Sequence, residues 1–198
     1  MILKIFLAFC LLVCVVYVQS VVDFCVADLN LRIGLVGYPC QNVSQVVVGN
    51  TSNFFRVAVT GAFDATLPGL NGLGLSMFRL DIDVGGVIPI HTHRVSELIV
   101  VIEGTILASF IDSDNIAYFK TLNKGDVMIF PQSVLHFQAN VRDVPALAFV
   151  SLNSANPSFQ LTSGSLFANN LPSSIVQKIT LIDEEQVKKL KGIFGGTN

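Results

Sequence analysis

The chain has 198 residues, of which 13% are charged, and a formal net charge of −2. This length suits one domain with a sizeable core. The net charge is slightly negative and the sequence has no basic patch, so we do not expect the protein to bind nucleic acid. An ordinary soluble domain is about 25% charged, so a surface this poor in charge predicts large contacts between subunits.

The first 20 residues are typical of a secretory signal peptide. Lys4 precedes an apolar run over residues 5–18, and Gln19 and Ser20 follow at the expected cleavage point. The run is short for a membrane span, and no second long apolar segment with charged flanks follows it. We therefore expect a secreted, extracellular protein with no membrane span. The alternative is an uncleaved anchor.

Two of the four cysteines, Cys10 and Cys14, fall within this signal and leave Cys25 and Cys40 as a pair. In an oxidising compartment we expect Cys25 and Cys40 to form a disulfide. It would close a loop of about 15 residues and stabilise the fold by roughly 3 kcal/mol. A metal-binding or catalytic thiol is the alternative, and it fits that compartment poorly. The disulfide would staple an N-terminal arm over residues 21–53.

Two Asn-X-Ser/Thr tripeptides follow, beginning at Asn42 and Asn50. Both lie in polar, turn-like surroundings and are acceptors for N-glycosylation in a secreted chain. Such tripeptides also arise by chance. We expect them to carry glycan only if the chain is secreted. The sequence therefore predicts a glycoprotein.

From Phe54 onward, short segments rich in β-branched and aromatic residues alternate with Gly, Asp, Asn or Pro. The segments that we expect to be strands are 55–59, 73–84, 97–103, 105–111, 117–121, 126–130, 134–138 and 146–152. Many short strands at regular spacing predict a β-sandwich or barrel. We assign this barrel to residues 54–155, with no internal repeat beyond two related hairpins.

All three histidines of the chain fall in those two hairpins. His91 and His93 stand two residues apart, Glu97 follows four residues later, and His136 lies in the second hairpin. Residues i and i+2 of a strand share a face, so His91 and His93 can offer both imidazoles to one point. A lone His-X-His is more often part of a surface strand or loop. Here the pattern uses every histidine, and three imidazoles with one carboxylate suit a divalent transition metal.

After Asn153 the pattern becomes helical, and we assign residues 156–198 to a C-terminal extension. Asp183 is the expected N-cap of a helix with Gln186 at its third position, and apolar residues recur at helical spacing: Val187, Leu190 and Phe194. We expect this helix to end within residues 192–196 and shorter helical turns over 164–170 and 172–178. Such a tail would clasp another subunit; the alternative is that it folds back on its own barrel.

The glycines around the histidines are spaced as in a known protein family. Gly85, His91, His93, Glu97 and Gly104 are spaced as in the first cupin motif, and the second is resembled by Gly125, Pro131, His136 and Asn140. The start DFCVADL and the segments PGLNGLG and KGD resemble plant germin-like proteins. The closing KKLKGIFGGTN resembles the branch named as auxin-binding proteins of nineteen to twenty kilodaltons. The likeness covers essentially the whole mature chain.

This resemblance implies an all-β, cupin-type jelly-roll barrel with a C-terminal helical extension, assembled as a homo-oligomer, a trimer of dimers. It implies a place in the plant cell wall or apoplast. It also implies manganese as the cofactor, with four metal ligands: His91, His93, Glu97 and His136. Gln138 and Asn140 share the strand parity of His136 and are candidates for hydrogen bonds that orient a ligand. The alternative is that both are ordinary polar strand residues.

The chain departs from true germins at a position that bears on substrate. Those oxalate oxidases hold oxalate with two asparagines near the metal, and this chain has Asn71 at the first place but Phe78 at the second. Losing such a hydrogen bond in a buried pocket costs about 1–3 kcal/mol. Oxidation of oxalate is therefore not expected.

Three further departures concern geometry. The segment between Cys40 and Asn50 is shorter than in germin-like chains. Arg94 replaces the usual proline in a ligand turn one residue shorter, and Ser133 replaces the usual glycine. The change at Arg94 could move Glu97 relative to His93 and so lower the affinity for the metal.

Three functions stay open at this point. The first is a secreted manganese oxidoreductase of the superoxide dismutase type, because manganese can cycle between two oxidation states and a net positive site attracts small anions. The second is an extracellular module that binds auxin or another small molecule. The third is a wall or storage protein with a structural metal.

Overall fold

The computed structural model describes residues 58–197. The predicted signal peptide, the predicted disulfide between Cys25 and Cys40, and the acceptors Asn42 and Asn50 all lie outside the described residues. So does the start of the first predicted strand. Each helix within residues 58–197 falls short of the length and apolar character that a membrane span requires.

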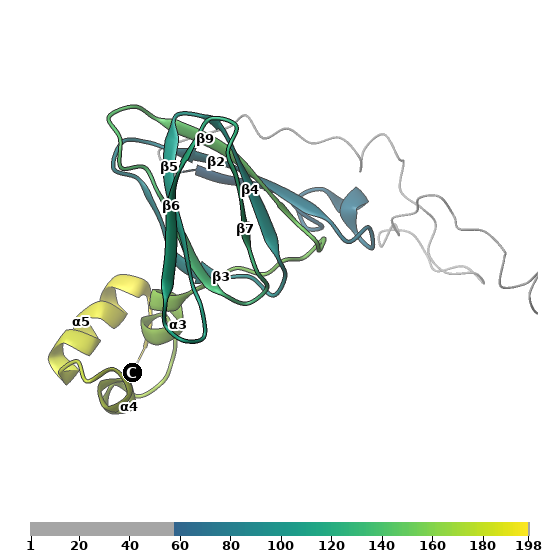
Figure 1. Ribbon diagram of the computed structural model, residues 1–198. Coiled ribbons are helices and arrows are strands. Elements are labelled where there is room, and N and C mark those ends of the chain that lie inside the picture. The colour runs from purple at the N-terminus through teal and green to yellow at the C-terminus, as the bar shows by residue number, and fades with distance from the viewer. Residues whose placement is uncertain (1–57, 198) are drawn as a thin grey trace, which may run out of the picture.

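The described chain forms strands first and helices last (Figure 1). The elements in order are β1 (Ala58–Ala62), the 3-10 turn η1 (Pro68–Leu70), β2 (Ser76–Ile82), β3 (Val87–Thr92), β4 (Glu97–Glu103), β5 (Thr105–Ile111), β6 (Ala117–Asn123), β7 (Val127–Phe130), β8 (Leu135–Ala139), β9 (Ala146–Leu152), β10 (Gln160–Leu161), α3 (Thr162–Phe167), α4 (Ser173–Thr180) and α5 (Glu184–Phe194). The predicted strand over 73–84 is shorter in the structure, and two strands are additional to the predicted segments, β3 and the two-residue β10.

The strands form two five-stranded antiparallel sheets. One has the order β1-β2-β9-β4-β7 and the other β10-β3-β8-β5-β6. Consecutive strands therefore often belong to different sheets, and the chain crosses between sheets after β3 and again after β4. The two sheets lie face to face (Figure 1), which confirms the predicted all-β jelly-roll fold.

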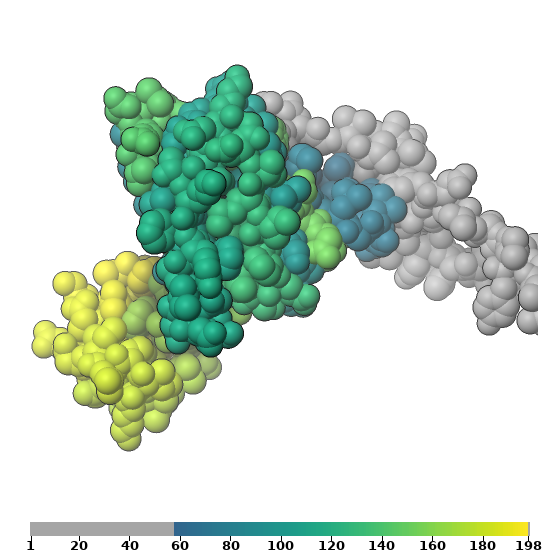
Figure 2. Space-filling model, viewed as in Figure 1, coloured from purple at the N-terminus to yellow at the C-terminus, as the bar shows by residue number. Residues whose placement is uncertain are grey.

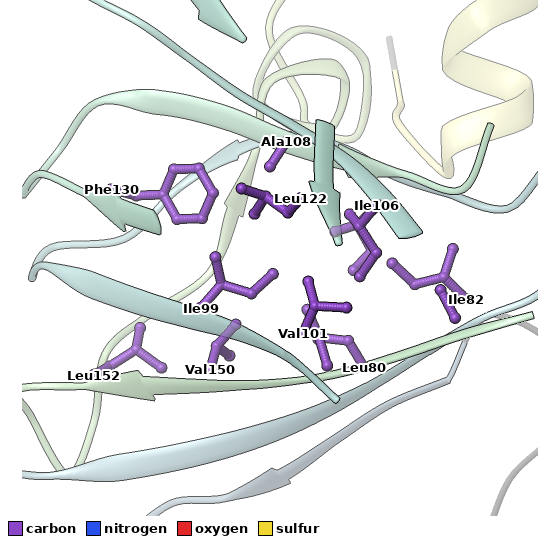
Figure 3. Close-up of a cluster of buried hydrophobic side chains, with 13 residues drawn as sticks. Leu80, Ile82, Ile99, Val101, Ile106, Ala108, Leu122, Phe130, Val150 and Leu152 are labelled. Atoms are coloured by element: carbon purple, nitrogen blue, oxygen red, sulfur yellow. The ribbon is translucent and has the colours of Figure 1, made fainter. Parts of the chain in front are cut away.

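Alternation of buried and exposed side chains explains why these segments are strands. Along β9, every second residue is buried from Ala146 to Leu152, while Ser151 is exposed. The buried residues of both sheets point toward one another, as Figure 3 shows for Ile99 and Val101 opposite Ile106 and Leu122. One apolar layer therefore fills the space between the sheets, and the site described below lies at one end of it.

Gly104 shows why the turn between β4 and β5 needs glycine. Its φ is +74°, and a Cβ atom there would lie 2.6 Å from the carbonyl oxygen of Pro145 and 2.9 Å from Cα of Ala146. Because both obstacles are backbone atoms, no side chain can be accommodated without moving the turn.

The three helices form a separate lobe at one end of the barrel, shown in yellow-green in Figures 1 and 2. The lobe has its own small core, made of Phe167, Val176 and Val187. As predicted, Asp183 caps α5 by accepting a hydrogen bond from the backbone N–H of Gln186 at 2.9 Å. The helix continues through Gly192, and it is Gly195, with φ +82°, that ends it.

Lys191 ties this lobe together from inside. Its side chain is 3% exposed, and its ammonium donates to the carbonyl oxygens of Asn169 (3.1 Å), Leu171 (2.5 Å) and Thr197 (2.6 Å). One cation thus satisfies acceptors on the α3–α4 connection and at the C-terminal end of the chain. Without these acceptors the buried ammonium would be costly.

The substitution Lys191→Met is expected to lower the free energy of unfolding of the lobe by about 2 kcal/mol, because it removes the donor to the carbonyls of Leu171 and Thr197. The carbonyl of Asn169 still accepts from the N–H of Thr197 at 3.0 Å. Hydrogen exchange of the α4 and α5 amides measures the change. Lys188→Met is the matched control: Lys188 is 53% exposed and pairs at 2.8 Å with Glu184, a surface pair whose loss costs roughly 0.5 kcal/mol. Equal exchange in the two variants would show that the buried ammonium does not stabilise the lobe.

Candidate metal centre

Four side chains from both sheets converge at one end of the barrel. His91 lies in β3 and pairs directly across the sheet with His136 in β8. His93 follows the end of β3, and Glu97 begins β4 in the opposite sheet. Their candidate ligand atoms all lie within 4.8 Å of one another, and all four residues are buried.

The three imidazole rings are held in one orientation by backbone carbonyls. The Nδ1 atom of His91 is 2.7 Å from the carbonyl oxygen of Pro89, and that of His136 is 3.0 Å from the carbonyl oxygen of Val134. The Nδ1 atom of His93 contacts the carbonyl oxygen of Ser158 in the same way. A carbonyl oxygen can only accept, so each Nδ1 carries the proton. In the neutral ring, Nε2 then keeps its lone pair for a metal.

The two carboxylate oxygens of Glu97 have different neighbours. Its Oε1 accepts a hydrogen bond from Nε2 of Gln138 at 3.2 Å. Its Oε2 lies 3.2 Å from Nε2 of His93 and 3.5 Å from Nε2 of His136. One oxygen is therefore fixed while the other faces the imidazoles.

These contacts test whether the residues fit a cation. With the proton on Nδ1, Nε2 of His93 and Oε2 of Glu97 are both acceptors, so they repel at 3.2 Å unless a cation or a proton lies between them. Among the described residues, Nε2 of His136 is buried with no hydrogen-bond partner. Three such nitrogens and one carboxylate oxygen are a donor set that divalent transition metals accept. The four residues therefore fit a metal ion.

The electrostatics keep the group in the protonation states that a metal requires. Burial, with the nearby charge of His136, lowers the pKa of His91 to about 4. Burial alone would raise the pKa of Glu97, but attraction from His136 and His93, in the state in which those rings carry a proton toward the carboxylate, outweighs it, and the pKa falls to about 2. At neutral pH, His91 is thus neutral and Glu97 is ionised.

Comparison with known proteins places this arrangement in a family. The cupin family model matches residues 48–188. The chain belongs to the cupin family. It is 48% identical to auxin-binding protein ABP19b of Prunus persica over 210 aligned positions, with all of both chains covered. It is also 51% identical to germin-like protein subfamily 3 member 3 of Arabidopsis thaliana, over 90% of each chain.

The same likeness extends to solved structures. An oxalate oxidase structure superposes on this cupin with a TM-score of 0.73 at 32% sequence identity, covering 89% of this chain and 96% of the other. The relative named auxin-binding protein thus matches the whole chain, and the relative named germin-like protein matches 90% of it. The family resemblance that the sequence suggested is confirmed.

In this cupin the shortened ligand turn leaves Glu97 close to the histidines. Arg94 is exposed, and its backbone N–H donates to the carbonyl oxygen of Pro157 at 3.1 Å. Glu97 still reaches His93, as the 3.2 Å contact shows. Ser133, at the position where glycine is usual, has φ +64°, and its N–H donates to the carbonyl oxygen of His93 at 3.0 Å. A turn that needs a left-handed residue is thus tied to the ligand segment.

Gln138 and Asn140, which share the strand parity of His136, have different roles in the structure. Gln138 is buried and holds Glu97. Asn140 is equally buried, but its Nδ2 donates to the carbonyl oxygens of Ile82 (3.0 Å) and Val144 (2.7 Å), and its Oδ1 accepts from the N–H of Arg142. Asn140 therefore fixes the loop after β8, while Gln138 orients a candidate ligand.

We expect Gln138→Leu to weaken metal binding by about 10- to 100-fold, because Glu97 loses the donor that fixes its orientation. Isothermal titration of the metal-free variant with manganese measures the change. Ser109→Ala is the control: its buried hydroxyl, on the neighbouring strand β5, has no hydrogen-bond partner in the described structure. Unchanged affinity in the Gln138 variant would mean that Glu97 needs no such support.

An apolar cavity of about 280 Å³ opens beside three of the four residues. Its polar lining comes from His91, His93, Glu97 and Gln138, and its apolar walls come from Val59, Phe78, Leu80, Ile88, Val150 and Phe159. Phe78 thus lies in the cavity, stacked on Phe63 with ring centroids 5.8 Å apart. Asn71 is exposed just after η1 and is not among the lining residues.

Proposed function

We propose that this germin-like cupin binds manganese and uses it to dismutate a small anion, superoxide. The observation that carries the proposal is the set of three Nδ1-protonated imidazoles and one carboxylate aimed at a single point. A divalent ion there would keep a net charge near +1 and open positions toward the cavity. Bound manganese would supply one-electron chemistry by cycling between two oxidation states.

The chain's own residues would prepare that chemistry in three ways. The carbonyls of Pro89, Val134 and Ser158 hold the imidazoles in the tautomer that a metal needs. Gln138 keeps the carboxylate of Glu97 turned toward the imidazoles. The apolar walls exclude water, which strengthens the attraction between the centre and a small anion.

Two observations argue against oxalate as the substrate. Phe78 lines the cavity where an amide would be needed, and its ring cannot donate a hydrogen bond to a dicarboxylate. Asn71 is exposed rather than in the cavity lining. The likeness to oxalate oxidase supports the fold and the metal-binding group, and not that substrate.

The test is superoxide consumption by protein stripped of metal and then reloaded with manganese. The proposal predicts activity well above that of the same concentration of free manganese, and loss of this activity in His91→Ala. Activity equal to that of free manganese would remove the oxidoreductase function, and unfolding on metal removal would then favour a structural metal.

A second function has its own supporting observation. The cavity is mostly apolar and has aromatic walls at Phe78 and Phe159, so a small ring-bearing carboxylate could place its charge at the metal and its ring among them. The relatives named auxin-binding protein fit this function. Calorimetry with indole-3-acetate, on manganese-loaded and metal-free protein, decides it: binding that requires the metal supports it, and no heat in either form rejects it.

We also propose secretion to the cell wall and assembly as a homo-oligomer, a trimer of dimers. Exposed apolar side chains support assembly, on the outer face of β4 and β7 and on the helical lobe: Leu98, Val127, Ile129, Ile179 and Leu181. Light scattering of the purified protein gives the oligomeric state, and a monomer at micromolar concentration would reject it. Mass spectrometry of the secreted protein would show cleavage after Ser20, the Cys25–Cys40 bond and any glycan at Asn42 or Asn50.

A further inference from the structure

Phe159 stands between the candidate metal centre and solvent. Its ring centroid is 4.6 Å from that of His91 and 5.6 Å from that of His93. The residue lines the cavity, yet it is 50% exposed. One side of the ring therefore covers two candidate ligands while the other side meets water.

The backbone that carries Phe159 is fastened on both sides. The preceding residues Pro157 and Ser158 give their carbonyl oxygens to the N–H of Arg94 (3.1 Å) and to Nδ1 of His93. After it, β10 pairs with β3, with Leu161 opposite His91. Because these bonds fix the main chain, opening at this place requires rotation of the phenyl side chain alone, which is a fast motion for an exposed residue.

Most of the other cavity walls cannot move in this way. Leu80, Ile88 and Val150 are at most 4% exposed and belong to the packed core. Phe78 is stacked on Phe63 and lies over Gly61, where an added Cβ would fall 2.4 Å from its ring. Val59, 46% exposed, is a short side chain on the other sheet.

We propose that the Phe159 ring is the gate of the cavity, so that its rotation sets how fast small anions reach the metal and how strongly their size slows them. This inference rests on the metal-dependent function proposed above. A gate slows entry and exit equally, because it raises the barrier between two states without changing either. The rates of association and dissociation should therefore change together, and the equilibrium affinity should not.

Cobalt(II) in place of manganese gives a visible spectrum that reports anion binding without any turnover. Stopped-flow mixing of the cobalt-loaded protein with azide and with benzoate yields both rate constants. In Phe159→Ala we expect both azide rates to rise about tenfold, equivalent to about 1.4 kcal/mol of barrier, with the affinity for azide unchanged. The rates for benzoate, which is larger, should rise by a greater factor. The rates should fall in the order Ala, Leu, Phe, Trp at this position.

Val59→Ala is the matched control, since it enlarges the cavity at another half-exposed wall. Thermal melting confirms that each variant is folded, and the leucine variant repeats the test with a milder change. Equal azide rates in the parent and Phe159→Ala proteins would overturn the gate while leaving the metal site standing, and so would an equal acceleration in Val59→Ala. Parent protein that binds no cobalt overturns both the gate and the proposed function.

Discussion

Substitution of His136 by alanine is expected to lower metal affinity by about 100-fold or more, which exceeds the usual effect of a residue that only supports a ligand. His136 pairs with His91 across the sheet and lies 3.5 Å from the carboxylate of Glu97. Its loss leaves three donors and opens a gap among buried groups. Elemental analysis after gel filtration measures retained metal.

The control for this variant lies on the same strand. Leu135→Ala changes the adjacent residue, which is exposed and points away from the site, so it should retain metal as the parent does. Added imidazole should enter the gap in the His136 variant and restore binding. A His136→Ala protein that keeps its metal through gel filtration would contradict the assignment of His136 as a ligand.

Acidification of the metal-free protein is expected to have a second large effect. The pKa of His91 falls from 6.5 to about 4 on folding, so between these values the unfolded chain binds a proton that the folded chain does not. The free energy of unfolding should therefore drop by about 3 kcal/mol as the pH falls through this interval. Glu97, whose pKa falls from 4.5 to about 2, continues the loss at lower pH.

Urea unfolding in buffers that span this interval measures the effect. His91→Gln is the control, because it lacks the titrating ring and should show a flatter dependence above pH 4.5. Manganese should raise stability most at neutral pH, since protons compete for the same nitrogens. A metal-free protein whose stability is constant across the interval would show that His91 is not held neutral by its surroundings.

The sequence could predict the composition of this site because the chain places all its histidines in two glycine-framed hairpins. The parity argument was sufficient for His91 and His93 but not for Glu97. Glu97 begins a strand of the other sheet, and it meets His93 because the chain crosses between sheets at that turn. The spacing of residues along one strand cannot predict the position of a residue once the chain has crossed to the other sheet.

Other features of the site depend on contacts that no local pattern records. Gln138 and Asn140 have the same parity and the same burial, and only the loop after β8 decides which one reaches Glu97. The contact between His93 and Ser158 joins residues 65 positions apart, so Phe159 carried no signal in the sequence. The end of α5 was predicted within residues 192–196, and the left-handed Gly195 is the residue that decides it.

The central claim is that four side chains from two hairpins bind one metal ion. Crystals of protein loaded with manganese, measured at the manganese absorption edge, test it most directly through the anomalous difference map. We predict one strong peak per chain, bonded to Nε2 of His91, His93 and His136 and to the carboxylate of Glu97. A map with no peak among these four residues, or with its peak elsewhere on the chain, would contradict the account.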